Sequence, residues 1–395
     1  MLSDFVERFR KEKHLGYRCR IPSFFAERLA RNLSEWYDDP MDMNERTTEY
    51  ILAQVRRYPA LQVQDLFKCL HQGVFGCGHF VSDRAAELLQ QELAELSDLD
   101  GPDLEVLSSR FCRIHLRMLA KTRLSPETLF RMFVLSSKEV CGTAGQLEHQ
   151  IICLLALARE GQLPFSVEQI LHNAAQWGDA GYPACHHSAE FRETYRPAYR
   201  VIHRKYERWL PLLAAIDQIM AEKGRAVVAI EGGSASGKTT LADLLQEIYG
   251  CTVFHMDDFF LQPHQRTSER LAEAGGNVDR ERFLTEVLLP LKQGAPVTYR
   301  RYDCQTQTLL PSIETVPTTL TIVEGAYSMH PELAEHYDLS VFLHITPELQ
   351  RVRILMRNGS EMADRFFSTW IPMEQHYFSE TDAANRCDLI LEVDT

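Results

Sequence analysis

The stretch that decides the fold reads Gly232-Gly233-Ser234-Ala235-Ser236-Gly237-Lys238-Thr239, followed by Thr240. Its spacing, G-x-x-x-x-G-K-[ST], is typical of the loop that holds phosphates in nucleotide-binding proteins. Gly232 and Gly237 allow a turn tight enough for backbone N–H groups to point at phosphate oxygens. We expect Lys238 to reach the β- and γ-phosphates and the Thr239 hydroxyl to ligate Mg²⁺. The stretch therefore predicts that the protein handles a nucleoside triphosphate.

The residues on either side of this loop support the prediction. The apolar, β-branched run Ala226–Ile230 precedes it and is short enough for a buried parallel strand. After it, Leu241, Leu244, Leu245 and Ile248 share one face of a helix, which Gly250 is placed to end. The chemistry needs a strand, a glycine-rich turn and a helix in this order, because the helix N-terminus adds a positive dipole at the phosphates.

Length and composition limit the function classes. The chain has 395 residues, 45% hydrophobic and 25% charged, which favours a soluble globular protein of two domains. A net charge of −13 argues against nucleic-acid binding by bulk electrostatics. Residues 1–8 lack the apolar core of a signal peptide, and no apolar run approaches membrane-spanning length. We therefore expect a cytoplasmic protein with ten reduced cysteines and no membrane or nucleic-acid partner.

The two halves of the chain differ in pattern. From about residue 216 to 395, apolar strand-like runs alternate with helical segments, at Ala226–Ile230, Cys251–Met256, Leu320–Val323, Leu339–Ile345 and Leu389–Val393. This alternation predicts an α/β P-loop NTPase domain, a parallel sheet flanked by helices. Residues 1–215 show helical periodicity at Thr47–Arg57, Asp83–Leu96, Leu104–Ala120, Gln146–Arg159 and Ser188–Met220. We interpret that half as a separate all-α domain, with a soft boundary.

Acidic residues follow two of the predicted strands. Ligands of parallel sheets bind beyond the carboxyl ends of the strands, so these acids are the first candidates for chemistry. Transfer of a phosphoryl group to an alcohol needs a carboxylate that accepts or orients the hydroxyl proton, and Asp257 is our candidate. Asp258 either contacts substrate or caps the next turn. Glu324 ends the third strand, where it can hold water on Mg²⁺ or contact the attacking group.

Together, the loop, Asp257-Asp258-Phe259-Phe260, a Tyr-Asp segment and Glu324-Gly325 resemble the uridine kinase and phosphoribulokinase family of P-loop kinases over roughly residues 224–395. The resemblance implies ATP and Mg²⁺ as cofactors and Asp257 as the base or orienter of the acceptor hydroxyl. It also implies a closing lid helix at Glu348–Gly359 with arginines 351, 353 and 357, and Arg365 just beyond. We expect Arg353 and Arg357 to neutralise charge on the transferred group.

Departures from the family pattern bear on the acceptor. Tyr302, Asp303 and Thr306 match the family's segment that binds the base, whereas Gln307 and Leu309 replace its histidine and arginine. The resemblance places Asp279 and Arg282 where the family builds part of its acceptor lid. Asp258, Asp279, Arg282, Tyr302 and Asp303 are thus the expected substrate contacts. We therefore expect the acceptor to be a nucleoside or another hydroxylated metabolite, and the two replacements argue against uridine itself.

The first half contains two clusters of cysteine and histidine. One comprises Cys69, His71, Cys77 and His79; the other begins at Cys185-His186-His187 and continues into Arg192, Tyr195, Arg196, Tyr199 and Arg200. Three interpretations stay open: a zinc site, although the spacing is not a standard one, an anion or substrate pocket, and ordinary helix packing.

The sequence leaves more than one hypothesis for the function of the protein. A small-molecule kinase is our first hypothesis, because a nucleotide-dependent switch with a partner-binding helical domain has no need of an acceptor base. A bifunctional enzyme whose first half has its own activity is a third hypothesis, and a homo-oligomer stays open.

Overall fold

A computed structural model describes residues 41–77, 84–97, 99–139 and 142–393. The chain divides into two compact units, one of residues 1–122 and 129–208, the other of residues 123–128 and 209–395. The division falls at 208/209, whereas the sequence placed it at 215/216. No helix among the described residues combines the length and the apolar character needed to cross a bilayer.

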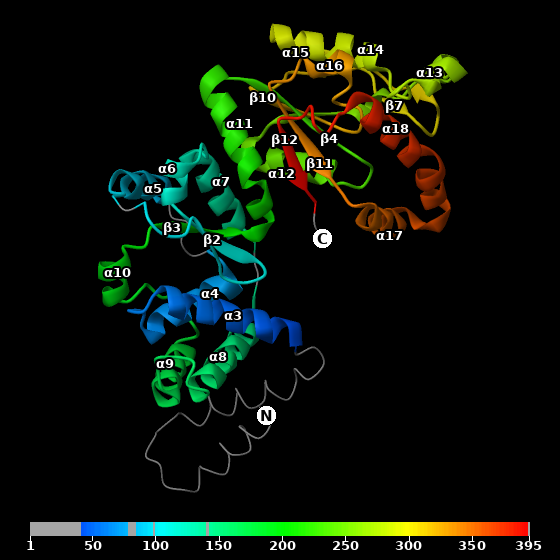
Figure 1. Ribbon diagram of the computed structural model, residues 1–395. Helices are drawn as coiled ribbons and strands as arrows, with labels where there is room; N and C mark the ends of the chain where they lie inside the picture. The colour runs from blue at the N-terminus through cyan, green and yellow to red at the C-terminus, as the bar shows by residue number, and fades with distance from the viewer. Residues whose placement is uncertain (1–40, 78–83, 98, 140–141, 394–395) are drawn as a thin grey trace. The chain divides into compact units, whose positions relative to one another are not determined.

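The first unit consists of helices around a small antiparallel sheet (Figure 1). Its elements are α3 (Met41–Arg57), α4 (Val63–Phe75), α5 (Ala85–Ala94), β1 (Leu104–Val106), β2 (Phe111–His115), α6 (Arg117–Lys121), α7 (Pro126–Ser137), α8 (Ala144–Arg159), α9 (Val167–Asp179), α10 (Ala189–Tyr195), β3 (Tyr199–His203) and the 3₁₀ segment η2 (Arg204–Trp209). Helix α7 begins in residues of the second unit. Helix α9 begins with a capping box, because Ser166 Oγ accepts from the backbone of Gln169 and the Gln169 side chain accepts from the backbone of Ser166.

The prediction of an all-α first domain is wrong. Strands β1, β2 and β3 pair in that order as an antiparallel sheet, inside the two ranges expected to be helical, 104–120 and 188–220. Glu105 and Arg113 are register partners on β1 and β2 and form a buried ion pair at 3.0 Å. Every residue of β2 is buried, so the strand lacks the alternation of a half-exposed strand, and its charged residues resemble the polar positions of a helix.

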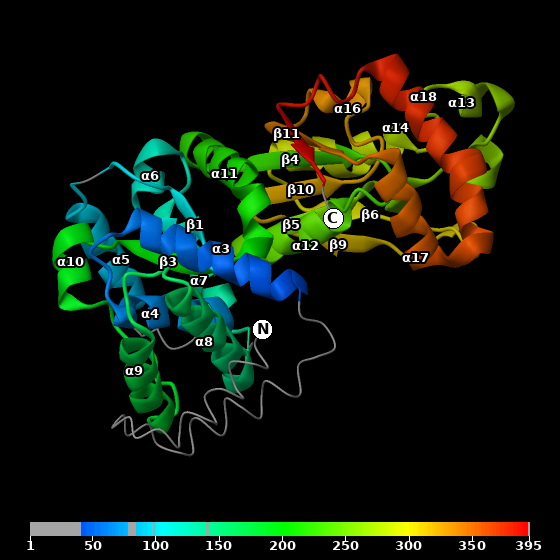
Figure 2. The ribbon, with the colours of Figure 1, turned by 60° about the horizontal axis from the view of Figure 1, so that its bottom comes forward.

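The second unit is built on a parallel sheet (Figures 1 and 2). Its sheet strands are β4 (Ala226–Gly232), β5 (Thr252–His255), β10 (Leu320–Glu324), β11 (Leu339–His344) and β12 (Leu389–Glu392), in the order β12-β11-β4-β10-β5. All five predicted strands are confirmed, and all neighbours pair in parallel. The sheet is flanked by helices, including α11 (Leu210–Lys223) and α12 (Lys238–Tyr249), as a P-loop NTPase fold requires.

Shorter elements complete the second unit. They are η3 (Met256–Phe259), η4 (Pro263–Gln265), α13 (Ser268–Ala272), α14 (Arg280–Phe283), η5 (Leu284–Leu288), α15 (Leu289–Gln293), β6 (Val297–Tyr299), β7 (Tyr302–Asp303), β8 (Thr308–Leu309), β9 (Ile313–Thr315), α16 (Pro331–Ala334), α17 (Pro347–Arg365), η6 (Phe366–Trp370) and α18 (Ile371–Thr381). A core that includes Phe254, Phe259, Phe283, Val323 and Tyr377 joins the sheet to the segments from η3 to α15 and to α18.

Candidate phosphoryl-transfer site

The phosphate loop leaves β4 and enters α12 with the backbone that its glycines were predicted to supply. Gly232 has a φ of 149° and Gly237 a φ of 95°, both in the region that favours glycine. A Cβ at Gly232 would lie 2.7 Å from the carbonyl oxygen of Leu343, so packing also demands glycine there. A Cβ at Gly237 would meet no heavy atom within 4 Å, which leaves open space above the start of the helix.

Side chains of α17 and α18 form hydrogen bonds with the phosphate loop. The carboxylate of Glu374 accepts a hydrogen bond from Ser234 N at 2.9 Å and another from Ser234 Oγ at 2.6 Å. Gln350 donates to the carbonyl of Ser234 at 2.9 Å, and Arg353 donates to the carbonyl of Ala235 at 3.2 Å. The C-terminal helices therefore fix the conformation of a loop more than 100 residues earlier in the chain.

Side chains from two neighbouring strands, β5 and β10, meet side chains from the start of α12 at the carboxyl edge of the sheet. Glu324, at the end of β10, is the register partner of both Ile230 on β4 and His255 on β5. Its Oε1 accepts from Thr239 Oγ1 at 3.0 Å and lies 2.6 Å from His255 Nδ1. Lys238 Nζ donates to the carbonyl of Gly233 at 3.0 Å. The strand order thus brings the predicted Thr239 and Glu324 together.

The carboxyl groups at this edge differ in their electrostatics. Burial acts to raise the pKa of Glu324, but the hydrogen bond from His255 and the charge of Lys238 outweigh it and lower that pKa. The hydrogen bond to Glu324 raises the pKa of His255. Glu324 therefore stays ionised and can act as a metal or hydroxyl contact.

Asp257 follows β5 and keeps an exposed face, although many protein atoms surround its carboxyl group. This loss of hydration raises the pKa of Asp257, and the neighbouring Glu324 raises it further, whereas Lys238 lowers it. Loss of hydration also raises the pKa of Asp258. A carboxylate whose pKa lies above its ordinary value, beside a lysine and a second acid, is suited to accept a proton.

The other predicted residues have contacts within the protein. Asp279 caps α14 by accepting from Arg282 N at 3.1 Å. Arg282 stacks on Phe259 at 4.3 Å and donates to the carbonyl of Asp258 at 3.2 Å, while Tyr302 is buried and its hydroxyl accepts from Arg266 at 2.8 Å.

Two predicted residues stay near solvent. Asp303 accepts from Gln305 N and Thr306 Oγ1 in the exposed β7–β8 turn. Arg357 is exposed on α17, and its charge lowers the pKa of Asp257. Among the predicted lid arginines, Arg353 is thus the one with a hydrogen bond to the loop itself.

Glu231 is a site residue that the sequence analysis missed. It is fully buried at the end of β4, and its carboxyl group accepts from the backbone of Gly232, Tyr327 and Met329 and from the hydroxyl of Tyr377. Burial raises the pKa of Glu231 to about 7. An acid inside an apolar run, directly before the first loop glycine, was the signal that could have found it.

The residues at this edge fit a triphosphate and Mg²⁺. The Thr239 hydroxyl and the Glu324 and Asp257 carboxylates are the hard oxygen donors that Mg²⁺ prefers. The hydroxyl of Ser236 is buried and has no hydrogen-bond partner among the described residues, so the loop holds a donor that a phosphate oxygen would satisfy. The first N–H groups of α12 lack intrahelical partners, as at any helix start, and add to this donor set.

The cysteine and histidine clusters of the first unit give no support to a zinc site within the described residues. No group of three or more His, Cys, Asp or Glu side chains there is arranged to hold a metal ion. His79, which belongs to the first cluster, lies outside the described residues. His187 instead lies between Asp65 and the hydroxyl of Tyr199, at 2.8 and 2.7 Å.

Comparison with known proteins places the similarity in the second unit. The model of the phosphoribulokinase / uridine kinase family matches residues 227–385. The uridine kinase of Staphylococcus aureus is 27% identical over 177 residues, covering 40% of this chain and 84% of that enzyme. Uridine kinase-like protein 4 of Arabidopsis thaliana is 30% identical over 145 residues, and the chain spans 30% of its length. The family resemblance expected from the sequence is thus confirmed for this region.

A solved structure described as a possible uridine kinase from Bacillus stearothermophilus is 24% identical, with a TM-score of 0.36. Its match covers 48% of this chain and 99% of that one.

Proposed function

We propose that the second unit, which matches the phosphoribulokinase / uridine kinase family, transfers the γ-phosphoryl group of ATP to a hydroxyl of a nucleoside or related metabolite. The observation that carries the proposal is the hydrogen bond between Thr239 and Glu324 at the edge of the sheet, with Asp257 following the neighbouring strand β5 close enough for the charges of Glu324 and Lys238 to shift its pKa. A P-loop alone accounts for triphosphate binding. The additional carboxylate at Asp257, with a raised pKa, is what a hydroxyl acceptor requires.

Each side chain has a role in this proposal. Asp257 orients the acceptor hydroxyl and takes its proton as the acceptor oxygen bonds to the γ-phosphorus and the bond from that phosphorus to the bridging oxygen breaks. Lys238 and Arg353 neutralise charge at the phosphate loop. Thr239 and Glu324 would hold Mg²⁺, which supplies charge neutralisation at the phosphates when bound. Glu324 keeps its negative charge because His255 and Lys238 lower its pKa.

The acceptor is proposed only as a class. Leu309 pairs with Tyr302 across the β7–β8 hairpin, and Gln307 occupies its turn with a φ of 56°. The family's histidine and arginine are therefore replaced by residues whose backbones build this hairpin. We infer that the hairpin contacts a hydroxylated metabolite other than uridine, or that it contacts uridine without the histidine and arginine that the family uses.

The experiment is an ADP-release screen of the full chain across nucleosides, sugars, vitamins and hydroxy acids, with Mg²⁺ and ATP. We expect one acceptor class to stimulate ADP release and to appear as a phosphorylated product by mass spectrometry. Asp257→Asn removes the stimulation, whereas Asp243→Asn, an exposed change on α12, keeps it. ADP release that no acceptor stimulates would favour the nucleotide-dependent switch instead.

A further inference from the structure

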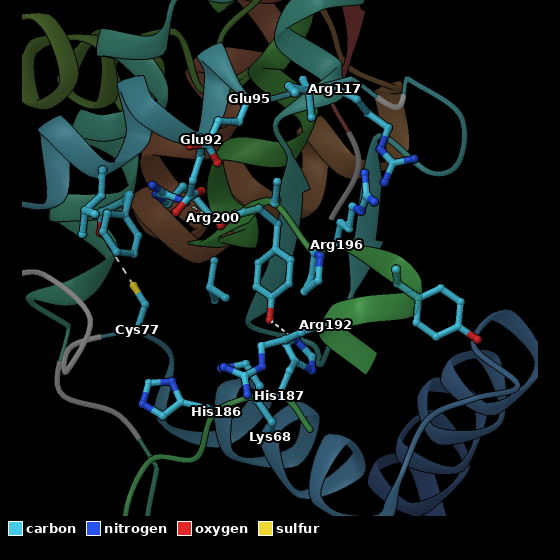
Figure 3. Close-up of a pocket in the computed structure, with 18 of the residues that line it drawn as sticks. Lys68, Cys77, Glu92, Glu95, Arg117, His186, His187, Arg192, Arg196 and Arg200 are labelled. Carbon is cyan, nitrogen blue, oxygen red and sulfur yellow. Dashed lines mark hydrogen bonds and ion pairs between the residues drawn. The ribbon is translucent and has the colours of Figure 1, made fainter. Parts of the chain in front are cut away.

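The first unit contains a cavity of about 760 Å³ that the proposed kinase does not use (Figure 3). Its walls come from α4, α5, α6, α7, α10, β3 and the segments before and after α10. The volume lies within the range of pockets that hold small metabolites. Several apolar side chains, including Leu88, Leu96, Phe133 and Val201, line it beside the polar ones, so it offers contacts to an organic molecule as well as to a charge.

Positive charge is concentrated around this cavity. Five cationic side chains line it, against two acidic ones: Lys68, Arg117, Arg192, Arg196 and Arg200, against Glu92 and Glu95. The chain as a whole has a net charge of −13, so an excess of positive charge at one cavity is the opposite of its overall charge. Figure 3 labels these five cations, together with Glu92 and Glu95, around the pocket. Such an arrangement attracts an anion and is costly without one.

The arginines that line the cavity differ in whether they form an ion pair with a carboxylate of the protein. Arg200 pairs with Glu92 at 2.7 Å, which neutralises both. Within the part of the chain that the structure describes, no carboxylate forms an ion pair with Arg117, Arg192 or Arg196. Two of these, Arg192 and Arg196, are exposed and lie four residues apart, at the end of α10 and just after it. Their guanidinium groups are thus available to a ligand.

The backbone at Arg196 supports this interpretation. Arg196 ends α10 in the left-handed conformation, with a φ of 41°, where glycine or asparagine is the ordinary choice. Holding an arginine there costs about 1 kcal/mol or more. The arginine side chain does not stabilise the end of the helix. A binding site that needs the guanidinium group at this position explains why arginine stands there instead of glycine or asparagine.

A hydrogen-bonded network lies at the floor of the cavity. Asp65 accepts from His187 Nδ1 and from both the backbone and hydroxyl of Ser188, and His187 Nε2 accepts from the Tyr199 hydroxyl at 2.7 Å. Burial lowers the pKa of His187 to about 4, so this histidine stays neutral at neutral pH. Beside it, Lys68 donates to the carbonyl of Cys185 at 3.0 Å. The recognition charge therefore comes from the arginines and Lys68 rather than from His187.

We propose that this cavity binds a small metabolite that carries a phosphate group, with Arg192 and Arg196 as its principal anion contacts. Arginine forks match phosphate oxygens in pairs, and an excess of three positive charges suits a dianion better than a carboxylate. The volume beyond the phosphate, lined by Phe133 and leucines, accommodates the organic part. The site lies in the first unit, so it stands whether or not the second unit is a kinase.

The test measures binding of inorganic phosphate and pyrophosphate to the full chain by equilibrium dialysis at fixed ionic strength. Because the phosphate loop binds the same anions, all proteins carry Lys238→Met. We expect saturable binding that weakens by about tenfold or more in Arg192→Gln/Arg196→Asn, since two charge-assisted contacts are lost. Asparagine preserves the left-handed backbone at position 196.

Two further variants complete the design. Arg56→Gln, an exposed arginine on α3 outside the cavity, is expected to bind both anions as tightly as the parent. The single change Arg192→Gln, at an exposed side chain, is expected to weaken binding severalfold while the thermal unfolding midpoint stays unchanged. Absence of saturable binding in the parent, or equal binding by the double variant and the parent, would overturn the proposal.

Discussion

Thr239 donates its hydroxyl to Glu324 across 3.0 Å, and so joins the first turn of α12 to the end of β10. The two residues are 85 positions apart in the chain and meet because β10 lies directly beside β4. In the proposed mechanism this pair would hold Mg²⁺. Thr239→Val keeps the shape of the side chain but removes the oxygen, and we expect about a hundredfold loss of kcat/KM with a higher Mg²⁺ requirement.

The Thr239 prediction is checked by a Mg²⁺ titration of acceptor-dependent ADP release. Asp243→Asn on the same helix serves as the control. An unchanged Mg²⁺ requirement in Thr239→Val would show that this hydroxyl does not contact the metal.

The lid arginines are predicted to differ. Arg353 donates to the carbonyl of Ala235 in the phosphate loop, whereas Arg351 stacks on Phe367 at 4.5 Å. We expect Arg353→Ala to lower kcat by about tenfold to a hundredfold, because a cation at the loop is lost. Arg351→Ala is the matched control on the same helix and is expected to stay within about threefold of the parent. Steady-state kinetics of both variants decide the point, and equal losses would mean that α17 acts through its packing alone.

Gly237 and Gly250 allow a separation of stability from nucleotide binding. They flank α12 with positive φ values of 95° and 64°, and a Cβ at either position would meet no heavy atom within 4 Å. Alanine at either position is expected to lower the unfolding free energy by about 1–2 kcal/mol through backbone strain. We expect only Gly237→Ala also to weaken ATP binding, measured by calorimetry, because only Gly237 belongs to the phosphate loop. A similar loss of affinity in Gly250→Ala would assign the effect to the helix as a whole.

Glu231 predicts a pH dependence of stability. Burial raises its pKa from 4.5 to about 7, so the folded protein favours the protonated form. The resulting stabilisation is fully present below pH 4.5 and is lost as the pH rises through about 7; its full size is on the order of 3 kcal/mol. We expect the difference in unfolding free energy between the parent and Glu231→Gln to be larger at pH 5 than at pH 8. Urea unfolding of both proteins at the two pH values measures it, and a constant difference would contradict the assigned ionisation.

The sequence predicted the second unit well for identifiable reasons. Buried parallel strands such as β4 and β10 are continuous apolar runs, and the acids that follow them mark the edge where ligands bind. The hydrogen bonds that Glu374 accepts from Ser234 of the phosphate loop could not be predicted. The Glu374 carboxylate reaches Ser234 only after α17 and α18 fold back over the loop. Local pattern contains no information on such a contact.

The first unit was harder because its short strands are buried and carry charges. Glu105 and Arg113 satisfy each other across β1 and β2, a pairing that depends on register rather than on residue type. The cavity arginines were visible as an Arg- and Tyr-rich segment, yet only the fold shows that Arg192 and Arg196 face the same space as Lys68.

The most direct test of the central claim is acceptor-dependent ADP release by the full chain, compared between the parent and Asp257→Asn. The account predicts that one class of hydroxylated metabolite stimulates release and is phosphorylated, and that Asp257→Asn lowers kcat with that acceptor by about a hundredfold or more while ATP still binds. Unchanged turnover of that acceptor by Asp257→Asn would contradict the claim.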